Sequence, residues 1–372
     1  MKKSIAIITT HPIQYQVPLF KKLSSSNIKL DVFFASKHGS NSKLKDKGFN
    51  KKFNWDIELL KGYNYFLPKK ENINVDHWKV SFENLENLLS KNKYNAILIF
   101  GWSNILYLKA LFIAKKLKIK TILRVETNLR LKNTIFKRII KFFFLKFLFS
   151  HIDFFLTIGK LNRQFYKSFA IDNSRLFNAP YFVDNNFFQN KKSSKLKKKI
   201  NFLFVGKLID RKNPLLFIKI AEKLKNKKNI HFNIVGSGPL FDTCKKEIKI
   251  KSLSNISMLG FRNQKELKKI YSNNDYLLLT SKYETWGLVV NEAMASGLPV
   301  ISSLNCGATH DLIKNKHTGF IYNTPNNLVK IVLKLSNNRK IQNKLIKNVK
   351  TKIKNYNVDE TIIAIKKIIY KS

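Results

Sequence analysis

The chain has 372 residues, more than one average domain, and 44% of them are hydrophobic, which is enough for sizeable cores and excludes wholesale disorder. Two cysteines, Cys244 and Cys306, exclude a disulfide scaffold and a multi-thiolate zinc site, and they are typical of a reducing compartment. The formal net charge of +47 favours an anionic partner. Only eight of the 70 basic residues are Arg, so a compositional bias toward Lys competes as the explanation of the charge.

The first half of the chain alternates short apolar runs with helical patterns. Buried strands are predicted at 5–9, 30–35, 96–100, 121–125 and 154–158, and helices at 106–117 and 161–169. This alternation is typical of a parallel sheet with helices on both faces. No run is long and apolar enough to span a bilayer, and the apolar run after Lys3 is too short for a signal peptide. We therefore expect a cytoplasmic protein.

Residues 133–149, NTIFKRIIKFFFLKFLF, predict a basic amphipathic helix. One stripe of this helix carries Phe136, Ile139, Ile140, Phe143, Phe144 and Phe147, whereas Lys137, Arg138 and Lys141 lie off it. Such a helix can lie peripherally on an anionic membrane surface, here the inner face of the cell membrane. The alternative is a helix that packs its Phe stripe against the sheet and leaves its Lys side chains outside.

The second half begins after a charge run at 191–199, which predicts a surface loop. Strands are then predicted at 202–205, 231–235, 256–259, 276–280 and 299–302, and helices at 214–224, 287–296 and 361–370. We therefore predict an α/β fold of two Rossmann-like, doubly wound domains that face a cleft. The domains are residues 1–185 and 186–358, followed by a helix at 359–372 that can cross back to the first domain. Ligands of such sheets bind beyond the carboxyl ends of the strands.

The strongest signal follows the strand predicted at 276–280. Glu284 lies in the loop before a helix and Glu292 in the second turn of that helix, so two carboxylates can flank a ligand. The backbone amides of Gly287 and Leu288 would face an anion between them. Carboxylates hold hydroxyl groups rather than phosphates, and a ligand with hydroxyls at both ends and phosphates between them is a nucleotide sugar. The alternative is a helix with a solvated Glu near each end.

Two further loops follow predicted strands. Gly206 and Lys207 begin a loop that continues to Lys212, and both lysines could reach a diphosphate; the alternative is two solvated lysines in a Lys-rich chain. Gly236 and Gly238 let the backbone approach a ligand, although a plain turn between strand and helix would look the same.

Together the three loops resemble glycosyltransferase family 4, whose members are retaining enzymes of the two-Rossmann-domain (GT-B) fold. The family's Glu-x7-Glu motif matches Glu284 to Glu292, its Gly-Arg-Leu-x3-Lys-Gly loop matches residues 206–213, and its Gly-x-Gly-Pro turn matches residues 236–239. Lys207 replaces the usual Arg and Asn213 the usual Gly. The opening, Thr10 to Gln16, looks like that of members that serve surface-polysaccharide and lipopolysaccharide synthesis.

The resemblance assigns roles to the matched residues. It implies that Glu284 contacts the donor sugar, Glu292 the ribose, and Lys207 and Lys212 the diphosphate. The donor base would stack near Gly260 and Phe261. The full set expected to bind substrate is Gly206, Gly236, Gly238, Gly260, Phe261, Thr285, Trp286, Gly287, Leu288 and Glu292.

In the first domain the resemblance is looser. His11 follows the first predicted strand and could contact acceptor or donor phosphate, or simply cap a helix. Glu126 follows the strand at 121–125, near where many members place a His, and is the best acidic candidate for catalysis. Arg124 can pair with Glu126 or a phosphate, and Gly101 and Trp102 could form an acceptor wall.

The function implied by this resemblance is transfer of a sugar from a nucleoside-diphosphate sugar to a glycan or lipid-linked acceptor, a hexosyltransferase-type reaction. It implies front-face retention without a protein nucleophile and with no metal or other cofactor. One alternative is an enzyme of the same fold and another reaction type, such as an epimerase of nucleotide sugars. The other alternative is a basic nucleic-acid-binding protein, which would show clustered Arg on a known module; no specific nucleic-acid partner is expected.

Overall fold

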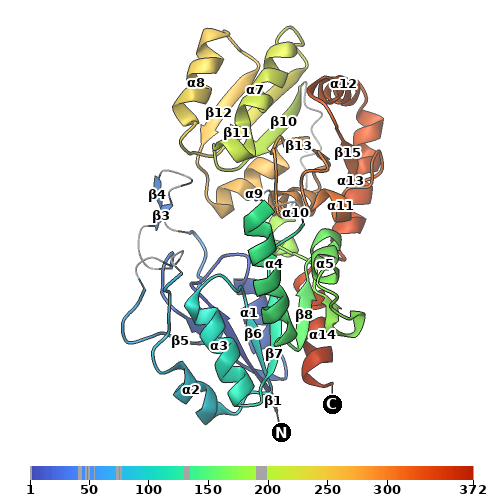
Figure 1. The fold of residues 1–372 in the computed structure, drawn as a ribbon. Coiled ribbons are helices and arrows are strands. Elements are labelled where there is room, and N and C mark those ends of the chain that lie inside the picture. Colours follow the sequence, from blue (N-terminus) through green and yellow to red (C-terminus); the bar gives the residue numbers. More distant parts are fainter. Residues whose placement is uncertain are drawn as a thin grey trace. The chain divides into compact units, whose positions relative to one another are not determined.

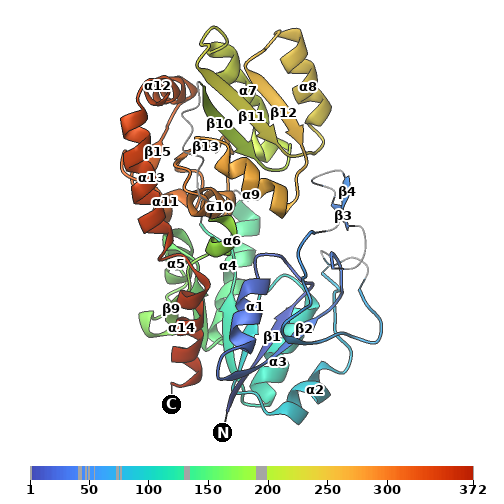
Figure 2. The ribbon, with the colours of Figure 1, turned by 180° about the vertical axis from the view of Figure 1, so that it is seen from behind.

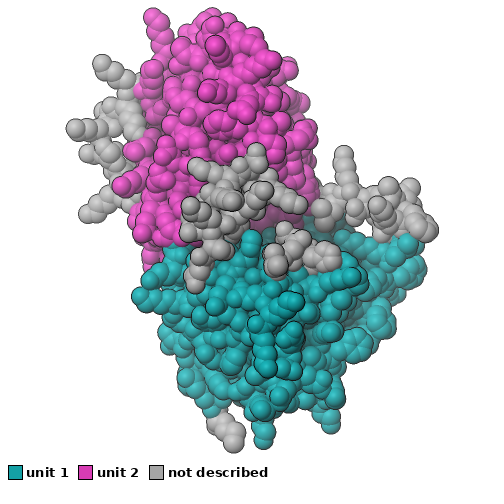
Figure 3. All heavy atoms as spheres, turned by 90° about the vertical axis from the view of Figure 1, so that its left-hand side faces the viewer, with its two compact units in different colours: residues 1–43, 57–181, 358–372 teal, residues 44–56, 182–357 magenta. Residues whose placement is uncertain are grey.

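The computed structural model describes residues 2–40, 44–46, 48, 51–53, 55–72, 75, 78–129, 135–189 and 199–371, with the backbone alone at 44–46, 51–53 and 135–138. The chain forms two compact units, coloured separately in Figure 3. Unit 1 comprises Met1–Lys43, Ile57–Tyr181 and Val358–Ser372, and unit 2 comprises Leu44–Asp56 and Phe182–Asn357. The units divide at 181/182 and 357/358, where the sequence placed boundaries at 185/186 and 358/359, and unit 2 also takes in 44–56.

Unit 1 is built on a seven-stranded sheet whose paired strands are all parallel. Its spatial order is β5 (Asn64–Phe66), β2 (Ile28–Phe34), β1 (Lys3–Thr9), β6 (Ala96–Ile99), β7 (Lys120–Arg124), β8 (Phe154–Thr157) and β9 (Leu176–Asn178). The order reverses between β1 and β6. This point is the topological switch at which open α/β sheets bind ligands.

Helices cover both faces of this sheet. One face carries α2 (Leu85–Asn92), α3 (Ile105–Lys116), α4 (Ile135–Ser150) and α5 (Lys160–Lys167), whose apolar side chains share one core with the strands. The opposite face carries α1 (Val17–Ser24) and α14 (Val358–Ile369), which pack against each other. Figure 1 shows the sheet from the side of α3 and α4, and Figure 2 from the side of α1 and α14. The C-terminal helix α14 therefore belongs to unit 1, together with the N-terminal strand β1.

Unit 2 is built on a six-stranded sheet whose paired strands are again all parallel. Its order is β12 (Ile256–Gly260), β11 (Ile230–Val235), β10 (Ile200–Val205), β13 (Tyr276–Leu278), β14 (Val300–Ser302) and β15 (Gly319–Ile321). Numbered within the unit this is 3-2-1-4-5-6, the order of a dinucleotide-binding Rossmann sheet. The switch point lies between β10 and β13.

One face of the second sheet is covered by α7 (Pro214–Lys223), α8 (Phe241–Ile250), α12 (Pro325–Ser336) and α13 (Arg339–Ile353), whose apolar side chains form the core of unit 2. The remaining helices are α6 (Asn185–Phe188), α9 (Gln264–Ser272), α10 (Val289–Ala295) and α11 (Thr309–Leu312). Of these, α10 packs on β14 and also contacts α6 and α13. An antiparallel pair, β3 (Leu44–Asp46) and β4 (Lys51–Phe53), is also assigned to this unit.

The two doubly wound sheets confirm the predicted fold class. The antiparallel pair β3 and β4 was not predicted. In the two large sheets each predicted strand is present, with ends that move by a few residues, whereas β5, β9 and β15 were not predicted. Each of these three strands has only three residues and forms one edge of its sheet. Such a short strand shows no recognisable alternation of apolar and polar residues in the sequence. Among the described residues no helix is long and apolar enough to cross a bilayer.

Candidate functional site

Three loops of unit 2 are tied together by backbone hydrogen bonds at the carboxyl ends of neighbouring strands. The amide of Gly206, after β10, donates to Val235 at the end of β11 (3.0 Å), and the amide of Gly236 donates to Gly260 at the end of β12 (2.9 Å). Leu208 donates to Ser237 at 2.9 Å, which joins the first loop to the glycine turn. The glycines that the sequence singled out therefore come together at one edge of the sheet.

Gly236 shows why this edge needs glycine. Its φ is +148°, and a Cβ atom at this position would overlap the carbonyl oxygen of Gly206. Any side chain here would force the two loops apart. The glycine turn is thus fixed by a close approach of two backbones, and Gly238 meets Leu208 in a similar way, with its Cβ position 2.7 Å from the Leu208 carbonyl oxygen.

A charge cluster centred on the buried Glu284 lies at the switch point of unit 2. Glu284 is 4% exposed, and its carboxylate pairs with the Nζ of Lys212 and, at 3.0 Å, with Nη1 of Arg211. Ser281 donates its hydroxyl to the same carboxylate at 2.8 Å. Lys212 and Arg211 come from the loop after β10 and Glu284 from the loop after β13, the two strands that flank the reversal of strand order. The structure therefore brings the predicted sugar contact and one predicted diphosphate contact into direct contact with each other.

The backbone holds Glu284 as firmly as its side chain does. Its amide donates to Asn305 and its carbonyl accepts from Gly307, both at 3.1 Å. A Cβ on Gly307 would overlap the carbonyl oxygen of Thr285, so a glycine is required where the two segments meet. The amide of Lys282 donates to Arg211 at 2.9 Å and links the loops after β10 and β13. The carboxylate is thus presented by a loop with little freedom to move.

Glu292 lies in the first turn of α10, since the helix begins at Val289 rather than at the predicted Gly287. It is buried, and Tyr271 on α9 donates its hydroxyl to the carboxylate at 2.7 Å. Burial raises the pKa of Glu292 to about 7, although hydrogen bonds from Tyr271 and Gln264 and the charge of Lys212 act in the opposite direction. Both motif carboxylates therefore interact with Lys212: Glu284 through an ion pair and Glu292 through its electrostatic field.

The other predicted residues of unit 2 lie on the same loops. Lys207 is half-buried beside Gly206, and Phe261 follows Gly260, whose Cβ position opens onto free space. Thr285 and Leu288 are half-buried, whereas Trp286 is buried and donates its indole N–H to Asn291 at 2.8 Å. Gly287 has φ +101°, and its Cβ position lies 2.9 Å from the sulfur of Cys306. Trp286 thus supports the loop from within.

Unit 1 carries a separate polar cluster beyond β7. Glu126 is exposed, and the hydroxyl groups of Tyr15 (3.0 Å) and Tyr181 both donate to its Oε1. Burial, reinforced by the charge of Glu126, raises the pKa of both tyrosines well above the ordinary value, so both stay protonated as donors. Two tyrosine hydroxyls therefore orient one carboxylate oxygen and leave the group accessible.

Arg124, at the end of β7, interacts electrostatically with this carboxylate. It is 6% exposed, stacks its guanidinium 5.6 Å from the ring centre of Tyr181, and donates to Thr361 on α14 at 3.4 Å. Burial lowers its pKa, and the charge of Glu126 partly offsets this effect. Tyr181 thus contacts both predicted partners: its ring lies against the Arg124 guanidinium and its hydroxyl donates to Glu126.

His11 lies at the switch point of unit 1. Its Nδ1 is 2.9 Å from the hydroxyl of Thr10, and its ring meets the ring of His38 edge-on at 5.7 Å. Gly101 follows β6, and a Cβ there would press on the ring of Tyr107. Trp102 contacts Phe144 and carries the ammonium group of Lys141 over its ring at 5.0 Å.

Several residues of the two clusters were not predicted from the sequence. Ser281 stands three residues before Glu284, and Arg211 stands directly before Lys212. Their closeness in sequence to predicted site residues was a usable signal. Tyr271 belongs to another helix, and Tyr15 and Tyr181 lie 166 positions apart in sequence. Nothing in a linear pattern joins these tyrosines to the carboxylates that they contact.

The loops of unit 2 fall within one recognised family. Residues 185–352 match the family model described as glycosyl transferases group 1. Residues 185–352 are a group 1 glycosyltransferase domain. The match selects this class over the nucleic-acid-binding alternative, and it confirms the predicted enzyme class for this part of the chain; membership of family 4 in particular stays a prediction.

Relatives of the glycosyltransferase domain act on several substrates. An N-acetyl-D-galactosaminyltransferase of Campylobacter jejuni, whose named acceptor is an undecaprenol-diphosphate-linked saccharide, is 29% identical over 54% of this chain and 55% of its own length. A UDP-galactose-dependent α-1,3-galactosyltransferase of Escherichia coli, which acts on GlcNAc-diphosphoundecaprenol, is 30% identical over 44% of each chain. The chain thus spans only about half the length of the curated relatives it matches.

The fold extends over the entire chain. A glycosyltransferase of Rickettsia africae superposes with a TM-score of 0.75 over 100% of this chain and 99% of its own, at 14% identity. At this identity the likeness shows the fold, which is that of GT-B glycosyltransferases.

Proposed function

We propose that the whole chain is a retaining glycosyltransferase that moves a sugar from a nucleoside-diphosphate sugar to a hydroxyl of a glycan or lipid-linked acceptor. The observation that carries the proposal is the buried Glu284 paired with Lys212 and Arg211 at the switch point of a Rossmann sheet, within a group 1 glycosyltransferase domain. A buried carboxylate beside a partly buried ammonium group suits a ligand that carries both hydroxyls and phosphates.

The ion pair explains how a donor can enter without leaving a charge unpaired. A sugar hydroxyl donates to Glu284 while a phosphate oxygen accepts from Lys212, so each charge exchanges one partner for another. This matters because a buried charge that loses its partner costs about 3–5 kcal/mol. Arg211 keeps contact with the carboxylate during the exchange, and Lys207 adds a second cation for the diphosphate.

The reaction follows from these contacts. The bond between the anomeric carbon and the phosphate oxygen breaks while the acceptor oxygen forms a new bond to that carbon on the same face. The acceptor proton passes to the departing diphosphate, and Lys212 and Lys207 stabilise the negative charge that develops there. No protein nucleophile takes part. We expect transfer without a metal, which activity in the presence of a chelator tests.

In this proposal unit 1 serves the acceptor. Glu126, aimed by Tyr15 and Tyr181, accepts a hydrogen bond from an acceptor hydroxyl, and His11 contributes a second polar contact. The relatives support this class of acceptor, since both named enzymes of Campylobacter jejuni and Escherichia coli use undecaprenol-diphosphate-linked saccharides. A role in bacterial surface-polysaccharide synthesis, at the inner face of the membrane, fits the same comparison. UDP is the donor nucleotide named for the Escherichia coli enzyme.

The decisive experiment is thermal unfolding with a panel of nucleoside diphosphates and their sugars. A ligand at a hundred times its dissociation constant stabilises the folded protein by about 2.7 kcal/mol, which moves the transition measurably. We expect one nucleoside diphosphate to raise the melting temperature and its sugar conjugate to raise it further. The conservative variant Glu284→Gln should retain the first shift and lose the second.

The matched control is Lys282→Ala. Lys282 belongs to the same loop, but its side chain is exposed and pairs only with Asp210 among the contacts described. This variant should respond to ligands as the parent protein does. Absence of any nucleotide effect at low and moderate salt would refute the donor site, and inverted anomeric configuration of the product, measured by NMR, would refute retention.

A further inference from the structure

Helix α4 of unit 1 presents an apolar face to solvent. Ile140 is 56% exposed, and Phe143 and Phe147, one and two turns further along, are each 65% exposed. Ile139, Phe142 and Phe144 widen this face with exposures of 51%, 38% and 41%. We call these six side chains the α4 outer face. The Phe stripe is therefore not packed on the sheet, and the side chains of Phe136, Lys137 and Arg138 lie outside the described residues.

The opposite side of the same helix is in the core. Leu145, Leu148 and Phe149 are at most 6% exposed and belong to the apolar core beneath the sheet. A helix that buries one apolar face normally shows a polar face to water. Here both sides are apolar, so burial against the sheet does not account for the outer face. Isolated exposed apolar side chains are ordinary, but a contiguous set marks an interaction surface.

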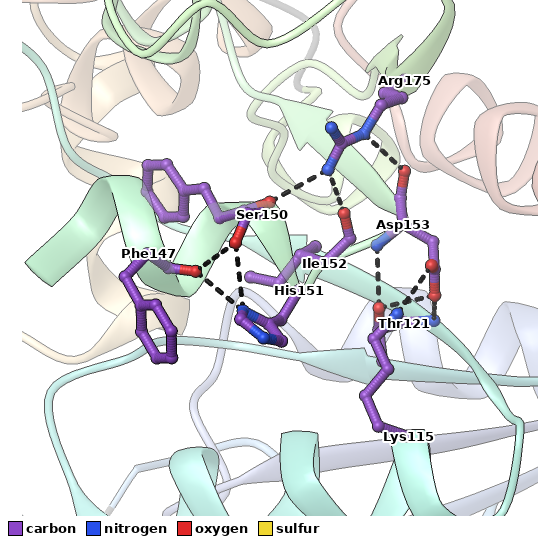
Figure 4. Close-up of polar contacts among 9 residues, drawn as sticks. Lys115, Thr121, Phe147, Ser150, His151, Ile152, Asp153 and Arg175 are labelled. Atoms are coloured by element: carbon purple, nitrogen blue, oxygen red, sulfur yellow. Dashed lines mark hydrogen bonds and ion pairs between the residues drawn. The ribbon is translucent and has the colours of Figure 1, made fainter.

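Polar contacts fix the C-terminal end of α4 to the sheet (Figure 4). Arg175 donates to the carbonyl of Phe149 at 2.9 Å and to that of Asp153 at 3.2 Å, and also to the carbonyl of Ile152. Asp153 in turn accepts from the amide and the hydroxyl of Thr121, both at 2.7 Å, and from Lys115 at 2.9 Å. The helix is thus held in place by groups on β7, α3 and the segment before β9, and its outer face has a fixed orientation on unit 1.

The charged residues of α4 and of the neighbouring α3 are all basic. Between Glu126 and Asp153 the sequence contains six basic residues and no acidic one. Lys146 is exposed on α4 beside Phe143 and Phe147, and α3, on the same face of the sheet, adds three lysines and no acid. Like charge disfavours a second copy of the chain as the occupant, whereas an anionic lipid surface complements it.

We propose that the α4 outer face docks unit 1 onto the surface of an anionic lipid bilayer, with Phe143 and Phe147 inserted among the acyl chains and Lys146 at the level of the headgroups. Aromatic side chains on the apolar side of a basic helix bind at this depth. The docking does not depend on transferase activity, so either proposal can fail without the other.

The test places an environment-sensitive fluorophore on the proposed insertion site. Cys244 and Cys306 are at most 1% exposed, so a single new thiol at Phe143→Cys can be labelled selectively. The matched control is Ile250→Cys on α8 of unit 2, a position of equal exposure (66%). Full-length protein is mixed with vesicles of phosphatidylcholine and phosphatidylglycerol at an ionic strength that screens the protein's overall charge.

We expect a blue-shifted emission and quenching by acyl-chain quenchers at position 143 and neither effect at position 250. In sedimentation with the same vesicles, Phe143→Ser/Phe147→Ser should lower the partition coefficient at least about tenfold. The control pair Trp78→Ser/Ile250→Ser should leave it unchanged. Equal signals at both labelled positions would show adsorption by charge alone and overturn the proposal. A concentration-dependent shift at position 143 without vesicles would overturn it in favour of self-association.

Discussion

The two units share a Rossmann strand order but build their polar sites in different ways. In unit 2 the site is made of loops joined backbone to backbone, with Gly236 and Gly307 at the points of closest approach. In unit 1 it is made of side chains, since Tyr15 and Tyr181 meet Glu126 through their hydroxyl groups. The same sheet therefore supports a site whose shape depends on glycine and a site whose shape depends on aromatic packing.

The difference has a chemical consequence. A backbone-built edge leaves room for a ligand that approaches the main chain closely, as a nucleoside diphosphate does. A carboxylate aimed by two tyrosines offers a directed acceptor for one hydroxyl group. Our proposal places donor binding in unit 2 and acceptor binding in unit 1, and the following changes test that division in order of decreasing effect.

The largest effect is expected for Lys212→Ala. Removal of the cation that stabilises the departing diphosphate should lower kcat/KM about 100- to 1000-fold. It also removes one partner of the buried Glu284, so the melting temperature should fall. Steady-state kinetics with donor alone, which report hydrolysis, and with acceptor should show equal losses. Loss of transfer alone, with donor hydrolysis intact, would contradict the assignment of Lys212 to the donor.

A smaller and selective effect is expected for Glu126→Gln. The substitution keeps the shape of the group but weakens a hydrogen bond to a charged acceptor, which is worth about 1.5–3 kcal/mol. We expect transfer to fall about 10- to 100-fold while the thermal shift caused by the donor stays unchanged. A matched control is Glu86→Gln, an exposed carboxylate of unit 1 that pairs with Lys116. If Glu126→Gln weakens donor binding as much as transfer, the division between the units is wrong.

The smallest effect is a pH dependence of donor affinity. Because burial raises the pKa of Glu292 to about 7, this carboxylate, which we propose binds the ribose, is largely protonated below that pH. Donor affinity should rise through pH 7 by up to about tenfold per unit of pH. The free energy of unfolding should respond in the opposite sense. Because the pKa of Glu292 is raised in the folded protein, its contribution to stability is fully present when the pH is below the ordinary pKa of a Glu carboxyl, and it is lost as the pH rises through about 7.

Two variants isolate this titration from that of the phosphate. Glu292→Gln should remove the part of the pH dependence that belongs to the protein. Tyr271→Phe should move its midpoint upward, because the Tyr271 hydroxyl stabilises the ionised carboxylate. Isothermal titration of the nucleoside diphosphate across this range measures both. A midpoint that stays the same in Tyr271→Phe would show that another group titrates.

Much of unit 2 could be predicted because its site is local in sequence. Gly206, Gly236 and Gly260 each follow a strand that is predicted by a run of apolar residues, and parallel strands place their carboxyl ends at one edge of the sheet. The positions of these loops follow directly. The partners of Glu284 do not: Lys212 was expected at the diphosphate, but its pairing with Glu284 depends on the adjacency of β10 and β13, which only the strand order provides.

In unit 1 less could be predicted. Glu126 was identified by its position after β7. Its two tyrosine partners come from elsewhere in the unit: Tyr181 follows β9, and Tyr15 lies in the loop between β1 and α1. The burial of Arg124 was also unpredictable, because α14 returns from the end of the chain and places Thr361 against it. The α4 stripe shows the same limit, since periodicity revealed an apolar face but not which side of the helix would meet the core.

The sequence by itself determined the two Rossmann-like sheets, the class of the domain at 185–352 and the loops that carry its polar residues. These depend on hydrophobic periodicity and on glycines at strand ends, which are local properties of the chain. The tertiary structure alone decided which charges pair, which carboxylate is aimed by tyrosines and which face of α4 remains in water. Those outcomes depend on contacts between segments that are distant in sequence, and such contacts form only when the strands have taken their order.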